Sequence, residues 1–167
     1  MIKYFIWTKR LFSNTYNIYS NGKTIGYLKN KAFSQLVNGR FNDKEYTFRT
    51  KGFFKQYTEI IDNTDSSLTG KITYNSWMTR AMLSVNSKIL NWKYDNLWNT
   101  KWYLSDQDRI LINYYDSTTS GQINSDTDDS LLILSGLFIA NYYKQMTAVS
   151  IMTLIVPVLA VTTVILR

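Results

Sequence analysis

Apolar and polar residues alternate in short runs along most of the chain, up to about residue 123. In residues 45–49, 71–75 and 91–95 every second residue is apolar. A period of two places alternate side chains on opposite faces of a β-strand, so one face enters a core and the other meets solvent. The pattern therefore predicts a chain built mainly of antiparallel β-strands.

Turn-forming residues separate these runs. Asn21-Gly22 is typical of a two-residue type I′ hairpin turn, because both residues accept a positive φ. Further turns are predicted at residues 38–39, 62–65, 95–96 and 105–106. The predicted strands are residues 1–10, 16–20, 23–28, 33–37, 44–50, 53–61, 68–74, 80–85, 88–94, 101–104, 110–115 and 120–123.

Residues 131–143 are apolar on every face of a helix and have no polar stripe for solvent. At ~1.5 Å per residue such a helix reaches about 20 Å, less than the ~30 Å hydrocarbon core of a bilayer, so protein is expected on all sides. A β-sandwich core is only ~10 Å thick and has no room for a helix. The predicted fold is a closed antiparallel β-barrel of about twelve strands around a central apolar α-helix at about 129–144, followed by a C-terminal hydrophobic helix.

A second apolar run covers residues 145–166 and contains no charged residue, with Lys144 before it and Arg167 after it. As a helix it would reach ~33 Å, enough to cross a bilayer. The chain is therefore divided into a barrel, residues 1–145, and a C-terminal membrane anchor, residues 146–167. The alternative is a helix or strand packed on the domain, which the β-branched residues favour. Pro157 weakens a helix in water but is tolerated in membranes.

The chain of 167 residues contains neither cysteine nor histidine. Thiol nucleophiles, Ser-His-Asp triads and the usual zinc or iron ligand sets are therefore excluded. Asp106 and Asp108 lie two apart in a predicted turn, and no separate catalytic acid accompanies them. We expect no enzymatic activity and no cofactor.

The formal net charge is +7, and it is concentrated in residues 1–60, where 11 lysines and arginines stand against three acidic residues. Such a field attracts phosphate-bearing partners. The candidate residues for binding a lipid headgroup are Lys29, Lys31, Arg49, Lys51 and Lys55. Exposed aromatic rings beside these cations would also suit a nucleic-acid strand, and solvated lysines around a packed core are the ordinary alternative.

The acidic turn before the central helix is a weak candidate for calcium. Asp126 and Asp128 have the i, i+2 spacing of the first ligands of an EF-hand loop, but the glycine and glutamate of that motif are absent. The alternative is that Asp128, Asp129 or Ser130 caps the helix. No other metal site is expected.

The four tryptophans after residue 70 have two interpretations. They form either an exposed interfacial or sugar-stacking surface, or the core and rim of the barrel, and the second is favoured. These residues are Trp77, Trp92, Trp98 and Trp102.

Consecutive hairpins that begin around residues 21–26 (Asn-Gly-Lys-Thr-Ile-Gly), with an apolar helix after an acidic turn near the end, resemble the tubby C-terminal-like superfamily. This superfamily includes tubby proteins, phospholipid scramblases and LURP-one-related proteins. The resemblance covers residues 2–144 and lies in the order of elements. It implies a twelve-stranded barrel around a helix, with phosphoinositide binding in tubby proteins and membrane association in scramblases. The cysteine-rich segment of scramblases is missing.

The sequence thus predicts a non-enzymatic, membrane-associated barrel that binds anionic lipid headgroups through basic residues, with the barrel in the cytoplasm. This interpretation does not include nucleic acid as a partner, and the sequence indicates no protein partner. The alternative is a soluble nucleic-acid- or protein-binding barrel, located in the cytoplasm, whose C-terminal segment packs on the domain or on a partner.

Overall fold

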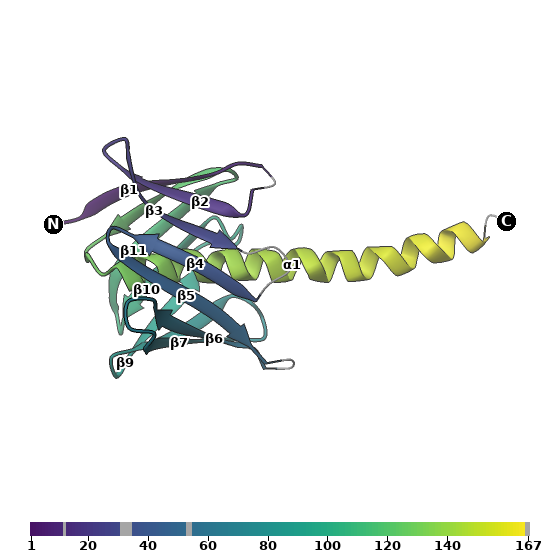
Figure 1. Cartoon of the computed structure of the whole chain (residues 1–167). Helices are drawn as coiled ribbons and strands as arrows, with labels where there is room; N and C mark the ends of the chain where they lie inside the picture. Colours follow the sequence, from purple (N-terminus) through teal and green to yellow (C-terminus); the bar gives the residue numbers. More distant parts are fainter. Residues whose placement is uncertain (12, 31–34, 53–54, 166–167) are drawn as a thin grey trace.

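Twelve β-strands and one helix make up the computed structural model, which describes residues 1–11, 13–30, 35–52 and 55–165, with side chains as far as residue 150 (Figure 1). The strands are β1 (Lys3–Lys9), β2 (Thr15–Ser20), β3 (Lys23–Asn30), β4 (Leu36–Phe41), β5 (Lys44–Lys51), β6 (Tyr57–Asp62), β7 (Leu68–Tyr74), β8 (Arg80–Val85), β9 (Lys88–Tyr94), β10 (Lys101–Asp106), β11 (Arg109–Ser117) and β12 (Ser120–Ser125). The helix α1 is Ser130–Ile165.

The strands form a closed barrel in which each strand pairs with its neighbours in sequence. β1 closes the ring by pairing antiparallel with β12, from Lys3 opposite Ser125 to Thr8 opposite Ser120. Closure satisfies the backbone hydrogen-bonding groups that an open sheet leaves at its edges. The predicted antiparallel barrel is therefore confirmed.

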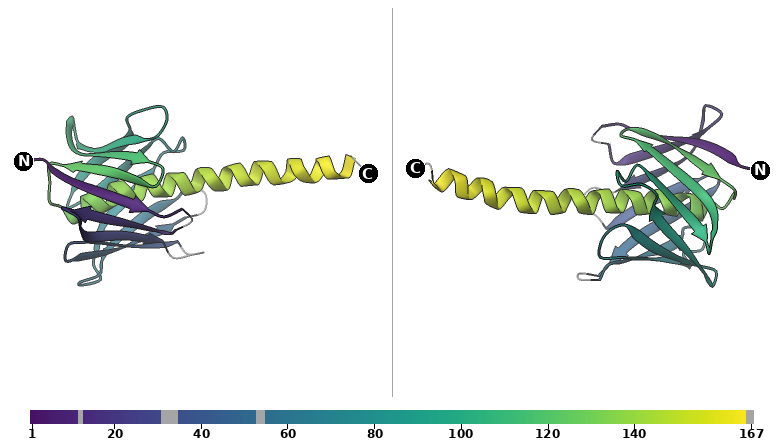
Figure 2. Two further views of the ribbon diagram at one scale, coloured as in Figure 1. Left: turned by 90° about the horizontal axis from the view of Figure 1, so that it is seen from above. Right: turned by 180° about the vertical axis from the view of Figure 1, so that it is seen from behind.

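α1 begins inside the barrel and runs along its axis, as the views from above and behind show (Figure 2). Its first four turns are surrounded by inward-facing strand side chains, and Ile133, Leu134 and Ile139 have no exposed surface. Phe138 stacks on Phe48 of β5 with ring centroids 4.5 Å apart. The predicted central helix is confirmed, because a helix without a polar face is buried on all sides by strands.

The two apolar runs belong to one helix rather than to two separate elements. α1 continues from the barrel axis without interruption to Ile165 (Figure 1). The residues expected to link the two runs, 144–147, read Lys-Gln-Met-Thr and contain neither glycine nor proline. Lysine, glutamine and methionine are good helix formers, so nothing in this stretch ends the helix. The suggestion that the C-terminal segment is an extra strand is wrong.

Two of the predicted turns are also wrong. Asn38-Gly39 lies inside β4, and Ser105-Asp106 lies at the end of β10. Gly39 faces the interior, where a Cβ atom would approach Leu134 of α1 to 3.2 Å and Leu28 to 3.3 Å. The glycine therefore allows the strand to approach the helix closely instead of forming a turn.

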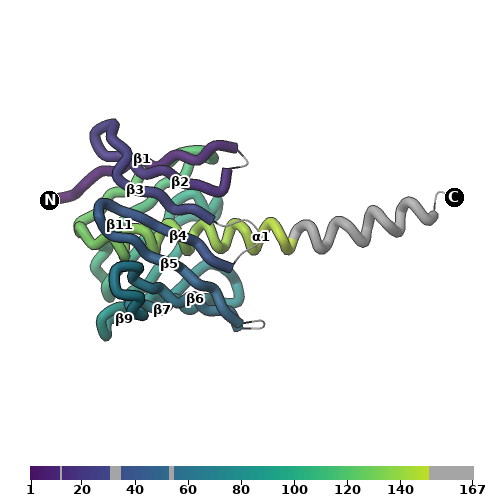
Figure 3. Tube along the Cα trace, in the orientation of Figure 1, coloured from purple at the N-terminus to yellow at the C-terminus, as the bar shows by residue number. Residues whose placement is uncertain are grey.

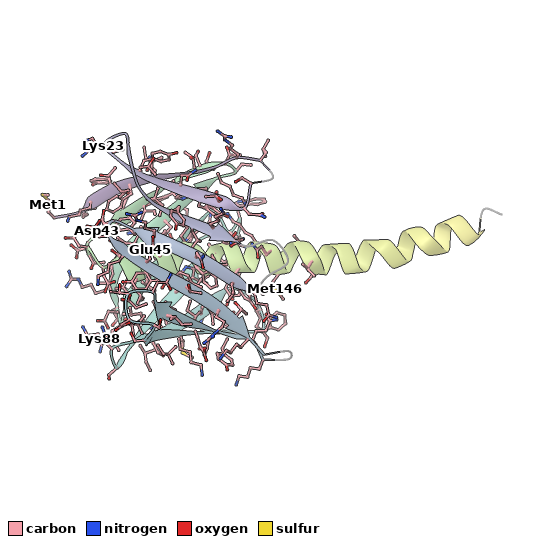
Figure 4. The ribbon with its side chains drawn as sticks, in the orientation of Figure 1. Met1, Lys23, Asp43, Glu45, Lys88 and Met146 are labelled. Carbon is pink, nitrogen blue, oxygen red and sulfur yellow. The ribbon has the colours of Figure 1, made fainter. Side chains whose placement is uncertain are left out.

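The barrel has two ends that differ in their contacts with α1. The exit end is where α1 leaves the barrel, and it carries the loops β1–β2, β3–β4, β5–β6, β7–β8, β9–β10 and β11–β12. The distal end carries the chain start, the other hairpin loops and the start of α1. The tube in Figure 3 shows α1 passing beyond the strands at the exit end. In Figure 4, Lys23, Asp43 and Lys88 lie at the distal end and Met146 lies at the exit end.

Candidate functional site at the helix exit

Two tryptophans and a tyrosine fix the depth of α1 in the barrel. Trp92 and Trp102 both donate their ring N–H to the carbonyl oxygen of Gly136, at 3.0 and 3.1 Å. Tyr114 donates its hydroxyl toward the carbonyl of Ile133 at 3.0 Å. Burial raises the pKa of Tyr114 well above its usual value, so the hydroxyl stays a donor. These bonds give polar partners to side chains that the core otherwise surrounds with apolar atoms.

A ring of polar contacts holds α1 where it leaves the barrel. The Asn141 side chain accepts a hydrogen bond from the Tyr16 hydroxyl at 3.1 Å and donates to Asn30 at 3.2 Å. One helical position later, Tyr142 donates to Gln56, and Tyr143 donates to the backbone carbonyl of Arg80. The contacted residues come from β2, β3, β8 and the β5–β6 loop, so the helix is tied to several sides of the rim.

An ion pair completes this ring. Lys144 pairs with Asp116 of β11, whose side chain is only 9% exposed. The Lys144 ammonium group also lies 5.5 Å from the ring centroid of Trp102. Burial lowers the pKa of nearby Lys9, and the charge of Lys144 lowers it further, while Asp116 acts in the opposite direction. Lys144 therefore pairs with a largely buried carboxylate where the helix emerges, and Lys9 lies close enough to be affected by both charges.

The two ends of the barrel carry opposite charge. Each end comprises its described loops, the two strand residues on either side of each loop, and the adjoining residues of α1 or of the chain start. The exit end has nine cations and two carboxylates, a balance of +7, whereas the distal end has six cations and nine carboxylates, a balance of −3. The exit-end cations are Lys9, Arg10, Lys29, Lys51, Lys55, Arg80, Lys93, Lys101 and Lys144.

Most of the predicted headgroup residues belong to the exit end. Lys29 lies near the end of β3, Lys51 ends β5, and Lys55 lies in the β5–β6 loop. Arg49 lies two residues further from the rim on β5. Lys31 lies outside the described residues. The strand order therefore brings Lys51 and Lys55 to one loop, with Lys29 two strands away.

The carboxylate of Glu59 in β6 offsets part of the positive charge of Arg49 and Lys51. Its carboxylate accepts hydrogen bonds from Lys51 and Arg49, both at 2.9 Å. These two bonds, that of Lys51 first, lower the pKa of Glu59, so the carboxylate is ionised at neutral pH. Arg49 and Lys51 together with Glu59 thus contribute one net positive charge rather than two.

The acidic turn before α1 is occupied by protein contacts. Asp126 pairs with Arg109, and Asp128 pairs with Lys3. Asp129 caps the helix by accepting from the backbone N–H of Leu131 at 2.9 Å and of residue 132 at 3.2 Å. Among the described residues, no group of three or more acidic side chains is arranged to hold a metal ion. The cap, one of the interpretations of this turn, is thus observed at Asp129.

The four later tryptophans separate into two pairs. Trp92 and Trp102 are in the core, at 0% and 1% exposed, whereas Trp77 and Trp98 stand in exit-end loops at 85% and 84% exposed. Trp92 and Trp102 fit the favoured interpretation, the core, whereas the exposure of Trp77 and Trp98 fits the other one, an exposed surface. Sequence reasoning did not separate the pairs, although a repeated pattern does: residues 75–80 read Asn-Ser-Trp-Met-Thr-Arg and residues 96–101 read Asn-Leu-Trp-Asn-Thr-Lys.

Searches against protein-family models, curated proteins and solved structures found no match to this chain. In the part of the chain whose side chains are described, which ends at residue 150, no helix combines the length and the apolar character needed to cross a membrane.

Proposed function

We propose that this protein is a non-enzymatic, membrane-associated β-barrel module that rests with its exit end against a bilayer and contacts anionic phospholipid headgroups through its basic rim. The observation that carries the proposal is the coincidence of two features at one end. The barrel end with a side-chain balance of +7 is also the end from which α1 emerges. That the chain belongs to the tubby C-terminal-like superfamily remains a prediction from the sequence.

The anchor in this proposal is the C-terminal part of α1. The run of 22 residues from 145 to 166 has no charged side chain, and Lys144 before it lies at the rim of the barrel. A charged residue at the start of an apolar helix reaches the headgroup layer readily. Because α1 is continuous, a membrane that accepts its C-terminal part meets the exit end of the barrel directly.

The basic rim adds electrostatic attraction to this arrangement. A lysine or arginine close to an anionic leaflet contributes roughly 1 kcal/mol, and the effect disappears within about 8 Å at physiological ionic strength. The distal end, with its balance of −3, is repelled by the same surface. The charges therefore favour one orientation of the barrel axis, with the exit end toward the bilayer.

Cell fractionation tests the anchor. The full-length protein is expected in the membrane pellet after lysis and high-speed centrifugation, and to leave it with detergent but not with high salt or alkaline carbonate. A protein that stays in the supernatant without detergent contradicts the anchor. It would favour the alternative, a soluble nucleic-acid- or protein-binding barrel.

A matched pair of charge variants tests the headgroup contact. Lys29→Gln with Lys101→Gln removes two charges from the exit end, and Lys23→Gln with Lys88→Gln removes two from the distal end; all four side chains are exposed. Capture of the full-length protein, diluted from detergent, by preformed anionic vesicles should slow about tenfold in the first variant only. Equal capture of the unaltered protein by neutral and anionic vesicles would remove the headgroup contact from the proposal.

A further inference from the structure

The β7–β8 and β9–β10 loops have the same sequence pattern and the same internal hydrogen bonds. In the first loop the Asn75 Oδ1 atom accepts from the N–H groups of Thr79 at 3.0 Å and Arg80 at 2.9 Å. In the second loop the Asn96 Oδ1 atom accepts from the equivalent N–H groups, of Thr100 and Lys101, both at 3.0 Å. In each loop the asparagine amide also donates to the threonine hydroxyl.

These bonds define the shape of each loop before any partner is present. The fourth residue of each repeated pattern, residues 75–80 and 96–101, has a left-handed backbone, with φ of 54° at Met78 and 55° at Asn99. The Tyr94 N–H donates to the Thr79 carbonyl at 3.3 Å, which ties the first loop to the end of β9, next to the second loop. A loop fixed in this way loses little conformational entropy when its tip binds a partner.

The tips of both loops expose large apolar side chains. Trp77 and Trp98 are 85% and 84% exposed, and Leu97 is 98% exposed. Leu11, in the β1–β2 loop at the same end, is 70% exposed. Folding thus leaves these side chains in contact with solvent, although burial of a tryptophan is worth a few kcal/mol.

The distal end has no equivalent of these tips. Its hairpin loops are Asn21-Gly22, Asn42-Asp43, residues 63–67, Asn86-Ser87 and Gln107-Asp108, and all of these residues are polar or glycine. The exposed apolar side chains near that end lie within strands, as Leu68 and Ile89 do, or in the chain start before β1, as Met1 and Ile2 do. Apolar tips among the described loops therefore occur only where α1 emerges.

We propose that the Trp77 and Leu97–Trp98 tips enter the headgroup and upper acyl region of an anionic bilayer beside α1. Tryptophan suits this region because its ring is apolar while its N–H finds polar partners at the interface. Arg80 and Lys101, the first strand residues after the two loops, meet the phosphate layer above the rings. This inference rests on the proposed membrane association and adds that loop side chains, besides the helix and the lysines, enter the lipid.

Tryptophan fluorescence of the full-length protein tests the inference. Of the five tryptophans, Trp7, Trp92 and Trp102 are at most 1% exposed, so quenching by added reagents reports on Trp77 and Trp98. In vesicles containing anionic lipid, we expect loss of quenching by aqueous iodide and gain of quenching by lipids brominated near the headgroup. The variant Trp77→Phe with Trp98→Phe should lose the lipid-dependent quenching and keep the emission of the three interior rings.

The possible outcomes separate this inference from the proposed function. A protein that pellets with membranes while Trp77 and Trp98 stay open to iodide overturns the loop insertion alone. Rings protected from iodide but not quenched by brominated lipid indicate cover by protein, and this also overturns it. Leu68→Glu with Ile89→Glu is the matched control, and it should leave both quenching signals unchanged.

Discussion

At Gly136, an added methyl group would favour the helix but would worsen the packing of the core. A Cβ atom at this position would overlap the Tyr114 ring. Gly→Ala in a helix ordinarily stabilises by about 1 kcal/mol, whereas overpacking a closed core costs about 1–3 kcal/mol. We expect Gly136→Ala to lower the free energy of unfolding in urea by up to about 2 kcal/mol, the difference between these effects.

The partner residue provides the control. Tyr114→Leu removes the ring that the new methyl group would strike, at its own cost in packing and hydrogen bonding. In that background Gly136→Ala should cost less than in the unaltered protein. An equal cost in both backgrounds would show that Tyr114 is not the obstacle.

Buried tyrosines make the fold sensitive to alkali. Burial, with a smaller effect of Asp116, raises the pKa of Tyr94 to about 12, and burial also raises the pKa of Tyr16 and Tyr114. The unfolded chain releases these protons near pH 10, while the folded chain keeps them. Stability is therefore complete below about pH 10 and falls as the pH rises toward 12 and beyond.

An alkaline titration tests this loss of stability. Circular dichroism follows the β-sheet, and phenolate absorbance follows the ionisation of the tyrosines. The buried tyrosines should ionise only as the β-sheet signal is lost. Ionisation of all 13 tyrosines with an intact sheet signal would contradict the burial described for this core.

At the scale of elements, Asp116 ties α1 to the barrel wall. Asp116→Asn leaves Lys144 without its carboxylate partner and removes the negative charge that acts on Lys9. A fully buried pair costs about 3–5 kcal/mol when one partner is removed, but Lys144 is partly exposed, so a loss of about 1–2 kcal/mol in unfolding free energy is expected. Adding Lys144→Met should recover part of this loss. Additive effects of the two substitutions, measured in urea, would exclude coupling between them.

Strand positions were predictable where alternation was strict. β7, β8 and β9 have the bounds expected from the sequence, because their apolar residues alternate between clear turn signals. β4 was misplaced because Asn38-Gly39 has the composition of a turn, whereas the glycine is explained by distant parts of the chain, above all Leu134 of α1. A local pattern cannot reveal that a helix a hundred residues later requires space at that strand.

The sequence predicted most of the proposed headgroup residues, but it did not predict that they lie at one end of the barrel. Lys29, Lys51 and Lys55 share one end of the barrel only because strands and hairpins alternate in direction around the ring. The continuity of α1 was missed because a charged residue, Lys144, separates two apolar runs that looked like different elements. The exposed tryptophans were missed because composition does not separate a loop ring from a core ring.

At the scale of the whole molecule, the proposed orientation predicts a pattern of surface protection. When the full-length protein is inserted into preformed vesicles, Lys23 and Lys88 should react with an impermeant amine reagent as they do in detergent. Lys29 and Lys101 should be protected, because the headgroup layer covers the exit end. Mass spectrometry of the labelled peptides measures all four residues at once. Protection of the distal pair instead would reverse the orientation.

The separation of charge between the two ends also orients the barrel before it touches a membrane. With +7 at one end and −3 at the other, the barrel has an electric dipole along its axis. Near a negatively charged surface such a dipole experiences a torque that turns the molecule during diffusion. The barrel is thereby aligned as it approaches, so that a larger share of collisions is productive at low ionic strength and this advantage fades as salt is added.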